Sequence, residues 1–409
     1  QDDKYGYIWI VSTQGLYALQ KRPGSVINSV DISHISSKLN NIFSEIVKDK
    51  SGNLWIAAFN EGLSMIDLNR PLIQNYSFPS IREKTGFVTN IKNIYEDKDG
   101  DLWIDQNRWG VGIFIPKSNK LLFCTDIPSL KNINNLKNIS CITSVSSIDE
   151  IWLGSEYYSE ICRLKKNKDR IEFLGTLKLS DFVENPGFPR FFYEDSKHNL
   201  WVVTTKKILV KPADEKQLQD TNFPLMDITG IKEGKDGTLW ISTRKQGVYN
   251  VIVSPGLTFE EKKIRNLTAQ TDGLINDNIG TICVDDSGLV WMGSQEGDVF
   301  TYDPQTKKVE NLSNMFDMLE EGIYNIIMDQ LGHIWISTNK RVVEYDPKNG
   351  GIMDYSTMGD VTVNSFMPNS YFKSSSGKIL YGGNRGISVF TPYEHLSDEP
   401  RRIKTMVAD

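Results

Sequence analysis

A short pattern of apolar and polar positions recurs along the whole chain. Asn278 to Pro304 shows it clearly, with the sequence NIGTICVDDSGLVWMGSQEGDVFTYDP. An apolar run is followed by an Asp-x-x-Gly turn, a run with a central Trp, a second turn with Gly and a third run. Runs of four to eight residues that are rich in β-branched and aromatic side chains between turn signals are typical of β-strands. The pattern therefore predicts repeated groups of short strands.

The Trp residues define the repeat. Neighbouring copies lie between 39 residues (Trp201 to Trp240) and 51 residues (Trp240 to Trp291) apart, and Leu380 takes the Trp position in a ninth copy. The eight Trp residues at this position are Trp9, Trp55, Trp103, Trp152, Trp201, Trp240, Trp291 and Trp335. Self-similarity at a period in this range indicates a repeat architecture.

Each unit has room for four short strands, because a further run follows a connection that contains Pro or Lys. Tandem four-stranded units of this length are typical of β-propeller blades, and a solenoid is the main alternative. A solenoid needs distinctive capping ends, which the sequence does not show. We therefore predict an all-β fold, a β-propeller of four-stranded blades. The repeated Trp is expected to pack between adjacent blades rather than to stack on a sugar.

The number of blades in a ring stays open. Nine units are present, but the first lacks an inner strand and the last lacks an obvious outer strand. One alternative is a single ring of eight or nine blades, closed by pairing of the incomplete ends. The other is a seven-bladed ring, with units one and two, at about 1–80, belonging to a preceding ring. Residues 1–395 are assigned to propeller repeats, and 396–409 to a C-terminal strand that could lead into a β-sandwich domain.

The Asp-x-x-Gly turns have a local structural explanation. Asp accepts hydrogen bonds from nearby backbone amides, and Gly adopts a positive φ. The units of Trp152 and Trp201 lack this Gly, so their turns must be built differently. The stretch DKDGDLWID, with Asp97, Asp99, Asp101 and Asp105, resembles a calcium loop, but it lacks the Gly and Glu positions of an EF-hand. A hairpin turn is the favoured interpretation.

Composition narrows the function classes. The chain has 409 residues, of which 39% are hydrophobic, and a formal net charge of −6 with both signs intermixed. This balance argues against a nucleic-acid binder, which needs a basic face. No apolar run approaches a membrane span of about 18 residues, and no signal peptide is evident, so we expect membrane and targeting segments to lie outside this chain.

Cysteine and histidine usage gives no sign of metal or redox chemistry. Cys124, Cys141, Cys162 and Cys283 stand singly in apolar runs, which favours buried free thiols, although the sequence leaves disulfides open. None of His34, His198, His333 and His395 has a partner at metal-ligand spacing. We therefore expect no metal site and no cofactor.

Propeller geometry points to one face for recognition. The turns between first and second strands open on one face, and the turns between second and third strands open with the blade connections on the other. The second face has the more variable sequences, and variable loops on a rigid scaffold commonly carry binding. The ligand-binding candidates are Arg108, Trp109, Tyr157, Tyr158, Arg190, Arg244, Lys245, Asn384 and Arg385.

Trp109 is the one Trp outside the repeated position. Aromatic rings stack on sugars, and a flanking Arg bonds hydroxyls or carboxylates, which suits a saccharide site with Arg108. Packing against a neighbouring blade, or contact with another domain or protomer, is the alternative for Trp109. Tyr157 and Tyr158 could equally be structural. The basic bias of these loops suggests an acidic glycan, although glutamates lie among them.

The repeat resembles a known family. Asp272–Pro304, DGLINDNIGTICVDDSGLVWMGSQEGDVFTYDP, is similar to the two-component regulator propeller repeat, and so are Ile42–Leu68 and Val88–Pro116. The closing GKILYGGNRGISVFTPYE resembles the last blade of such sensors, which precedes a small β-sandwich domain. The resemblance covers essentially the whole chain. It weakens in units four and five, where the turn Gly and the residues after Trp depart from the pattern.

The resemblance implies a sensing role. Such repeats form the periplasmic sensor region of hybrid two-component receptors of Bacteroidetes, ahead of a membrane helix and a histidine kinase. Their ligands are oligosaccharides from complex glycans, and binding activates genes for glycan use. The resemblance thus implies a non-catalytic periplasmic region of an inner-membrane receptor, which binds an oligosaccharide, contacts the membrane only through flanking segments and forms a homodimer.

Two other function classes remain. A propeller glycoside hydrolase or polysaccharide lyase would need two carboxylates at a central site, whereas the recurrent Asp residues here are turn residues. A protein-interaction propeller would bind no small ligand. Saccharide binding without turnover would separate the sensor from both.

Overall fold

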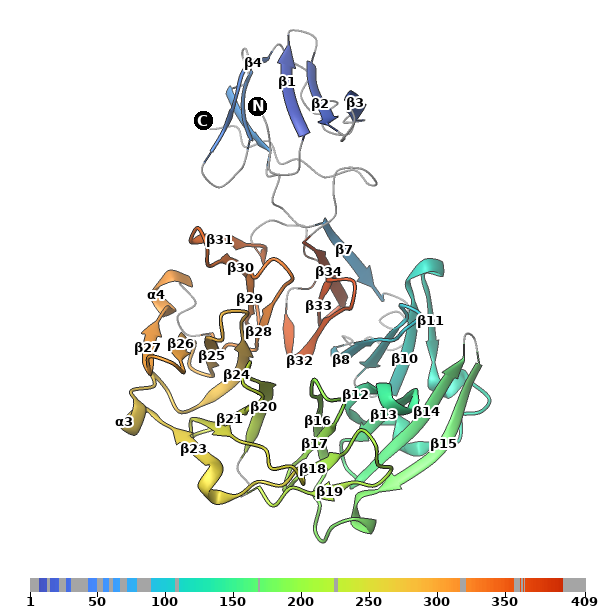
Figure 1. Cartoon of the computed structure of the whole chain (residues 1–409). Helices are drawn as coiled ribbons and strands as arrows, with labels where there is room; N and C mark the ends of the chain where they lie inside the picture. The colour runs from blue at the N-terminus through green and yellow to red at the C-terminus, as the bar shows by residue number, and fades with distance from the viewer. Residues whose placement is uncertain are drawn as a thin grey trace. The chain divides into compact units, whose positions relative to one another are not determined.

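The fold is described from a computed structural model of the whole chain (Figure 1). The described residues are 7–12, 15–21, 27–30, 43–49, 54–58, 62–66, 72–78, 90–106, 110–167, 170–223, 227–316, 321–356, 361, 363 and 365–392. The structure is all-β apart from short helical turns such as α3 (Ala269–Asp272) and α4 (Ser313–Phe316). Among the described residues no helix is long and apolar enough to cross a membrane.

Seven four-stranded antiparallel sheets follow one another around a centre, as in a propeller (Figure 1). Six of these blades consist of four strands that are consecutive in the chain, with the first strand innermost. Their strands are β8 (Ile91–Glu96), β9 (Leu102–Gln106), β10 (Gly110–Ile115), β11 (Lys120–Phe123); β12 (Ile139–Val145), β13 (Glu150–Ser155), β14 (Glu160–Asn167), β15 (Arg170–Lys178); β16 (Pro189–Glu194), β17 (Leu200–Thr204), β18 (Ile208–Lys211), β19 (Gln219–Asp220); β20 (Ile228–Glu233), β21 (Leu239–Thr243), β22 (Val248–Val251), β23 (Ile264–Leu267); β24 (Ile279–Val284), β25 (Val290–Ser294), β26 (Val299–Asp303), β27 (Lys308–Asn311); and β28 (Asn325–Met328), β29 (Ile334–Ser337), β30 (Val342–Asp346), β31 (Gly351–Asp354).

The seventh blade closes the ring with a strand from far upstream. Its chain-terminal part supplies β32 (Phe366–Lys373), β33 (Ile379–Gly383) and β34 (Gly386–Thr391), and its outer strand is β7 (Leu72–Ser77). The hydroxyl of Ser388 donates to the side-chain oxygen of Asn75 at 2.7 Å across this join. The last unit therefore lacks its own outer strand, as predicted, and receives one from β7.

Two three-stranded sheets precede the ring in sequence. The first contains β1 (Tyr7–Ser12), β2 (Gly15–Lys21) and β3 (Ile27–Val30), and the second contains β4 (Phe43–Lys48), β5 (Leu54–Ala58) and β6 (Gly62–Ile66). They lie in a compact unit separate from the one that contains Asn75–Ser375.

The observed seven-bladed ring agrees with the second alternative for the repeat, and a ring of eight or nine blades is not formed. Residues 72–77, which the sequence assigned to the first two units, join the seven-bladed ring as β7. That the two N-terminal sheets are blades of a preceding ring stays a prediction. The strand predicted in 396–409 lies outside the described residues.

Five of the repeated Trp residues, Trp103, Trp152, Trp201, Trp240 and Trp291, pack against the following blade, as predicted. The ring of Trp152 lies in one core cluster with Leu200 and Val202 of the next blade. Trp240 likewise packs with Val290 and Met292 of the blade that follows it. Because each indole fills the wedge between two twisted sheets, it buries apolar area on both sides and fixes the blades to each other.

In five units the first Asp of the turn is hydrogen-bonded to the Trp of the same unit. The side chain of Asp285 accepts hydrogen bonds from the amides of Ser287 (2.8 Å) and Leu289 (3.0 Å) and from the indole N–H of Trp291 (2.8 Å). The same six-residue spacing joins an Asp carboxylate to the indole in four further units: Asp49 to Trp55, Asp97 to Trp103, Asp195 to Trp201 and Asp329 to Trp335. One carboxylate thus joins the turn backbone to the indole that packs between blades.

The departing turns are built differently, as predicted. In the Trp201 unit His198 takes the left-handed position at φ 63°, where Gly288 has φ 93° in a regular turn. In the Trp152 unit Glu150 accepts the indole hydrogen bond at 2.9 Å, from a position two residues before the Trp. In the Trp240 unit Gly234 replaces the anchoring Asp.

All four cysteines are buried and free, as their apolar settings indicated. Burial raises the pKa of the Cys124 and Cys141 thiols to about 12 and that of Cys162 to about 11. These thiols stay protonated at neutral pH and behave as small apolar side chains.

Candidate functional site

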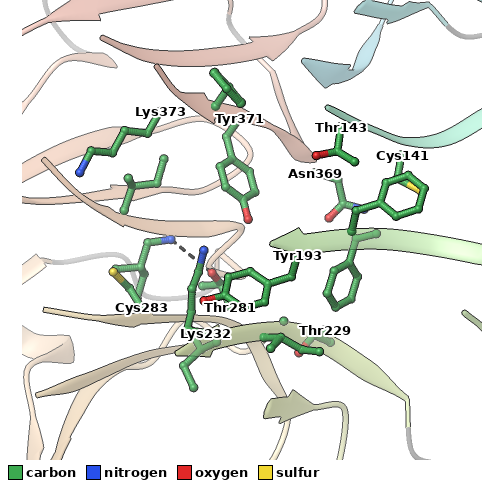
Figure 2. A pocket seen from close by; sticks show the side chains of 18 of the residues that line it. Cys141, Thr143, Tyr193, Thr229, Lys232, Thr281, Cys283, Asn369, Tyr371 and Lys373 are labelled. Carbon is green, nitrogen blue, oxygen red and sulfur yellow. Dashed lines mark hydrogen bonds between the residues drawn. The ribbon is translucent and has the colours of Figure 1, made fainter. Parts of the chain in front are cut away.

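A pocket of about 500 Å³ lies at the centre of the ring, and every blade contributes its innermost strand to the wall. The strands are β8, β12, β16, β20, β24, β28 and β32. Figure 2 shows the side chains of Tyr193, Lys232 and Tyr371 directed into this space from three different blades. A cavity of this size is within the range of small-molecule sites, about 300–1,000 Å³.

The charged groups of the pocket are mostly basic. Arg190, Lys232 and Lys373 line it, and Glu233 is the one carboxylate among the lining residues. The Glu233 carboxylate already accepts hydrogen bonds from the amide and the hydroxyl of Ser196, each at 2.8 Å. The Lys373 ammonium donates to the carbonyl of Met328 at 2.7 Å. The pocket therefore favours a ligand with negative charge.

Lys232 is the cation whose side chain extends toward Tyr193 in Figure 2. It lies in β20 directly opposite Trp240 of β21. Its Nζ is 5.8 Å from the centre of the Tyr193 ring, a cation–π contact. No carboxylate pairs with it within the described part of the chain. Lys232 is half-buried in the wall of the pocket.

Tyrosine side chains also line the pocket, and of these the Tyr95 hydroxyl donates a hydrogen bond to that of Ser144. The Tyr193 oxygen accepts a hydrogen bond from the amide of Glu233 at 2.9 Å, which leaves its own proton free to be donated. Burial raises the pKa of both Tyr193 and Tyr95, so each hydroxyl stays neutral. Tyr95 and Phe372 make an edge contact, with ring centres 5.2 Å apart. The wall thus offers ring faces and hydroxyl donors beside positive charge.

Arg190 is the described candidate that the structure brings into the pocket, at the start of β16. The other described candidates lie in turns between second and third strands. Tyr157 and Tyr158 are 57% and 55% exposed, and Arg244, Lys245 and Arg385 are also exposed. Asn384 is half-buried, and its side-chain oxygen accepts the Ser365 amide at 3.0 Å. Arg108 and Trp109 lie outside the described residues. A shared binding role for these turns stays a prediction.

Lys232, Tyr193 and Tyr371 were not predicted from the sequence, because they lie in the innermost strands and not in the variable turns. For Tyr193 and Lys232 the sequence does contain an indication of their position. Tyr193 and Lys232 each pair with the repeated Trp of their unit across the first two strands. Counting back from the Trp across the hairpin therefore finds a lysine in the otherwise apolar run DITGIKEG.

A second cavity, of about 450 Å³, lies on the face of the Asp-x-x-Gly turns between the first two blades of the ring. Beside it the Lys166 ammonium contacts three carboxylates, those of Asp97 (2.7 Å), Asp99 (3.1 Å) and Asp101 (2.6 Å). These are carboxylates of the calcium-like stretch. Because Asp97 also makes the turn hydrogen bonds and Lys166 neutralises the group, the stretch is explained as a hairpin turn.

Asp105, the last acidic residue of that stretch, lies apart in β9. It is 2% exposed, and its Oδ1 has no hydrogen-bond partner among the described residues. Burial raises its pKa to about 7, while the positive charge of Lys92 opposes the shift. Lys92 itself pairs with Glu156 at 3.3 Å.

Asp329, His333 and Glu344 lie close enough together to hold a metal ion, but their atoms already have partners. Asp329 accepts the indole of Trp335 and two turn amides. Glu344 accepts the Tyr355 hydroxyl and contacts His333 Nδ1 at 2.6 Å. The cluster is therefore explained as a structural part of its blade.

His333 should make stability depend on pH. Burial alone lowers its pKa, but the hydrogen bond to Glu344 and the charges of Glu344, Asp329 and Asp346 raise it overall. Its stabilising contribution is therefore complete below the unfolded value of about 6.5 and is lost as pH rises through the higher folded value. Urea unfolding between pH 5 and 9 should show this loss in the unmodified protein and not in His333→Gln. The exposed His198→Gln should behave like the unmodified protein; an unchanged profile for His333→Gln would contradict the assignment.

The chain is similar in structure to solved extracellular domains of two hybrid two-component systems. The extracellular domain of the hybrid two-component system BT3049 from B. thetaiotaomicron aligns with a TM-score of 0.61 and 19% identity, over 96% of this chain and 56% of that one. The extracellular domain of the hybrid two-component system BT4673 from B. thetaiotaomicron aligns with a TM-score of 0.58 and 18% identity, over 98% and 53%. This chain spans about half the length of each. The likeness establishes the propeller fold, and it agrees with the family resemblance of the repeat.

An enzyme shares the fold. The virginiamycin B lyase from Staphylococcus aureus aligns with a TM-score of 0.57 and 14% identity, over 78% of this chain and 99% of that one. No protein-family model matches the sequence, and no curated protein does. The comparisons thus place sensor domains and an enzyme on the same scaffold.

Proposed function

We propose that this chain is the extracytoplasmic sensing region of a hybrid two-component histidine kinase receptor. It recognises an oligosaccharide from complex glycan breakdown and so controls genes for glycan use. The observation that carries the proposal is the likeness to extracellular domains of two such systems over 96% and 98% of the chain. That coverage includes the N-terminal sheets as well as the ring, whereas the lyase alignment covers 78%.

The central pocket suits a saccharide. Sugars present apolar ring faces edged by hydroxyls, and sites for them combine aromatic side chains with a few well-placed polar groups. Here Tyr193 and Tyr371 provide rings and hydroxyls, while Asn369 and Thr143 add amide and hydroxyl groups (Figure 2). The exposed Tyr157 and Tyr158 offer further rings on the face of the variable turns.

Binding without turnover is the expected behaviour. A glycoside hydrolase needs two carboxyl groups about 5–9.5 Å apart at the scissile bond. Among the residues that line the central pocket Glu233 is the one carboxylate, and Ser196 already donates two hydrogen bonds to it. This arrangement supports a sensor over a glycosidase on the same fold.

The proposed receptor places this region in the periplasm, with the membrane helix and the kinase in flanking segments. A homodimer is part of the same proposal, because the kinase would act across two subunits. Detection of the chain in the periplasmic fraction, and of a dimer by light scattering, would support it; a cytoplasmic location would contradict it.

The test is a glycan array followed by calorimetry on the purified chain, with a turnover assay on every saccharide that binds. We expect at least one oligosaccharide fraction to bind and to be recovered unchanged. Sustained release of product would replace the sensor by an enzyme. Failure of every saccharide to bind would favour a propeller that recognises a protein.

The turn tyrosines give a more specific prediction. Replacing Tyr157 and Tyr158 together by Ala should weaken binding of the identified oligosaccharide about fivefold or more, because each lost ring–sugar contact removes roughly 0.5–1.5 kcal/mol. Leu174→Ala, a half-exposed position on the outer strand of the same blade, is the matched control and should leave the affinity unchanged. Equal affinities for both variants in calorimetry would remove these tyrosines from the site.

A further inference from the structure

A lysine in the wall of the central pocket has no anionic partner in the described ranges of the chain. Buried or half-buried lysines are normally paired with a carboxylate, because desolvation of a charge is costly. Lys166 in the same ring follows this rule, with three carboxylates around its ammonium. For Lys232 no carboxylate partner is found among the residues that the structure describes, and its ammonium contacts the Tyr193 ring. The ammonium of Lys232 is therefore free to bind an incoming anion.

The position of Lys232 in the repeat makes it distinctive. In every blade one residue of the innermost strand stands directly opposite the Trp or Leu380 position. Lys232 carries the only charge among these seven. The residues are Tyr95, Thr143, Tyr193, Lys232, Cys283, Ile327 and Phe372. Packing between blades is served equally well by the neutral side chains, so it does not explain a lysine here.

The surroundings of Lys232 match a sugar that carries an acidic group. The Tyr193 ring lies 5.8 Å from the ammonium, and its hydroxyl keeps a proton to donate. Tyr371 directs its hydroxyl into the same space (Figure 2). An ammonium group with two phenol donors can bind the oxygens of a carboxylate or a sulfate, while the ring faces contact the sugar.

The rest of the wall adds to the positive charge. Arg190 and Lys373 also line the pocket. The Glu233 carboxylate already accepts two hydrogen bonds from Ser196. The volume of about 500 Å³ is within the range of sites that bind small molecules, about 300–1,000 Å³.

We propose that the central pocket binds the acidic group of a sugar, a uronate carboxylate or a sulfate ester, through Lys232, with Tyr193 and Tyr371 as hydrogen-bond donors. The saccharide nature of the ligand rests on the proposed sensing function, whereas the anion site rests on the pocket itself. The proposed function left the class of oligosaccharide open, and the anion site specifies an acidic one.

The test is calorimetry with three probes of matched size: a uronate-containing disaccharide, a sulfated disaccharide and their neutral counterpart. The unmodified protein should bind one acidic probe at least about tenfold more tightly than the neutral one, and raised salt should reduce the difference. Lys232→Met should abolish this preference. Lys235→Met, an exposed turn lysine of the same blade, should keep it. The uronate and sulfate arms identify which acidic group is recognised.

Folding of Lys232→Met is checked by its thermal unfolding, which should be unchanged or raised, because the change removes an unpaired charge. Tyr371→Phe, which deletes only the hydroxyl, is the second variant and should reduce the acidic preference by a smaller factor. Equal affinity for acidic and neutral probes, or an acidic preference that persists in Lys232→Met, would overturn the proposal.

The outcomes also separate this proposal from the sensing function. Binding of neutral oligosaccharides that is indifferent to Lys232 would leave the sensor intact and remove the anion site. If no oligosaccharide binds at all, the sensing proposal fails, and the anion site is then tested with free glucuronate and inorganic sulfate. Thermal stabilisation by these anions in the unmodified protein but not in Lys232→Met would retain the site; stabilisation in neither would overturn it.

Discussion

Replacement of Lys166 by Met is expected to lower the free energy of unfolding of the seven-bladed ring by about 3–5 kcal/mol. The Lys166 side chain is 6% exposed, and its ammonium lies 2.6–3.1 Å from the carboxylates of Asp97, Asp99 and Asp101. Without it three carboxylates would face one another, and that of Asp97 has little access to water. Asp97 would be affected most, because its carboxylate is as buried as the lysine and also accepts the Trp103 indole hydrogen bond.

Urea denaturation followed by Trp fluorescence measures this loss. Lys165→Met is the matched control, since Lys165 is the adjacent residue and its ammonium makes only an exposed contact of 3.7 Å with Asp149. Its effect should stay within about 0.5 kcal/mol. A Lys166→Met protein as stable as the control would show that the carboxylates do not depend on this ammonium, and the hairpin explanation of the acidic stretch would then need a different counter-charge.

Replacement of Asp285 by Ala is expected to cost about 2–4 kcal/mol of stability. The carboxylate satisfies the amides of Ser287 and Leu289 and the indole of Trp291, and hydrogen bonds to a charged group contribute roughly 1.5–3 kcal/mol each, partly recovered when water replaces the acceptor. The indole N–H has the least access to water, because Trp291 is 2% exposed.

Asp286→Ala is the control for this change, because Asp286 is the next residue of the turn and is exposed. The difference in urea midpoint between the two variants isolates the anchoring role from the loss of one acidic charge. Equal midpoints would mean that the Asp-to-indole link does not stabilise the ring. The Trp240 blade forms with Gly234 in place of the Asp, so the fold itself should survive the substitution.

The proposed sensing role depends on the rigidity that these contacts provide. A ring whose blades are joined by buried indoles holds its inner strands at fixed positions, so the groups around the central pocket are arranged before a ligand arrives. In the proposed receptor the affinity would come from a pre-formed wall, and the signal would pass to segments outside this chain.

Much of the fold could be predicted from local patterns. The recurring Trp, the Asp-x-x-Gly turns and the strand-length runs determine four-stranded blades, because hairpin pairing and turn chemistry act between residues that are near in sequence. The packing of Trp152 and Trp240 against the next blade follows from the same repeat. Even the irregular turns were foreseen, since a missing Gly requires another residue, here His198, in the left-handed position.

The closure of the ring could not be predicted in the same way. β7 lies about three hundred residues before β34 in the chain, and nothing in LIQNYS distinguishes the outer strand of the seventh blade from that of the second unit. Which edge it pairs with depends on how many blades complete the circle. The number of blades in turn depends on the summed twist of the packed sheets, a property of the assembled ring.

The sequence by itself determined the repeat, the all-β blades, the wedge position of the indoles and the acidic turns, because these arise from short-range periodicity and hydrogen bonding. Only the tertiary structure decided that seven blades close around a pocket, that Lys166 reaches the carboxylates of the preceding blade, and that Lys232 meets Tyr193 and Tyr371 at the centre. These residues are separated by tens to more than a hundred positions along the chain. They come together because curvature accumulated over all seven sheets brings the innermost strands to a common axis.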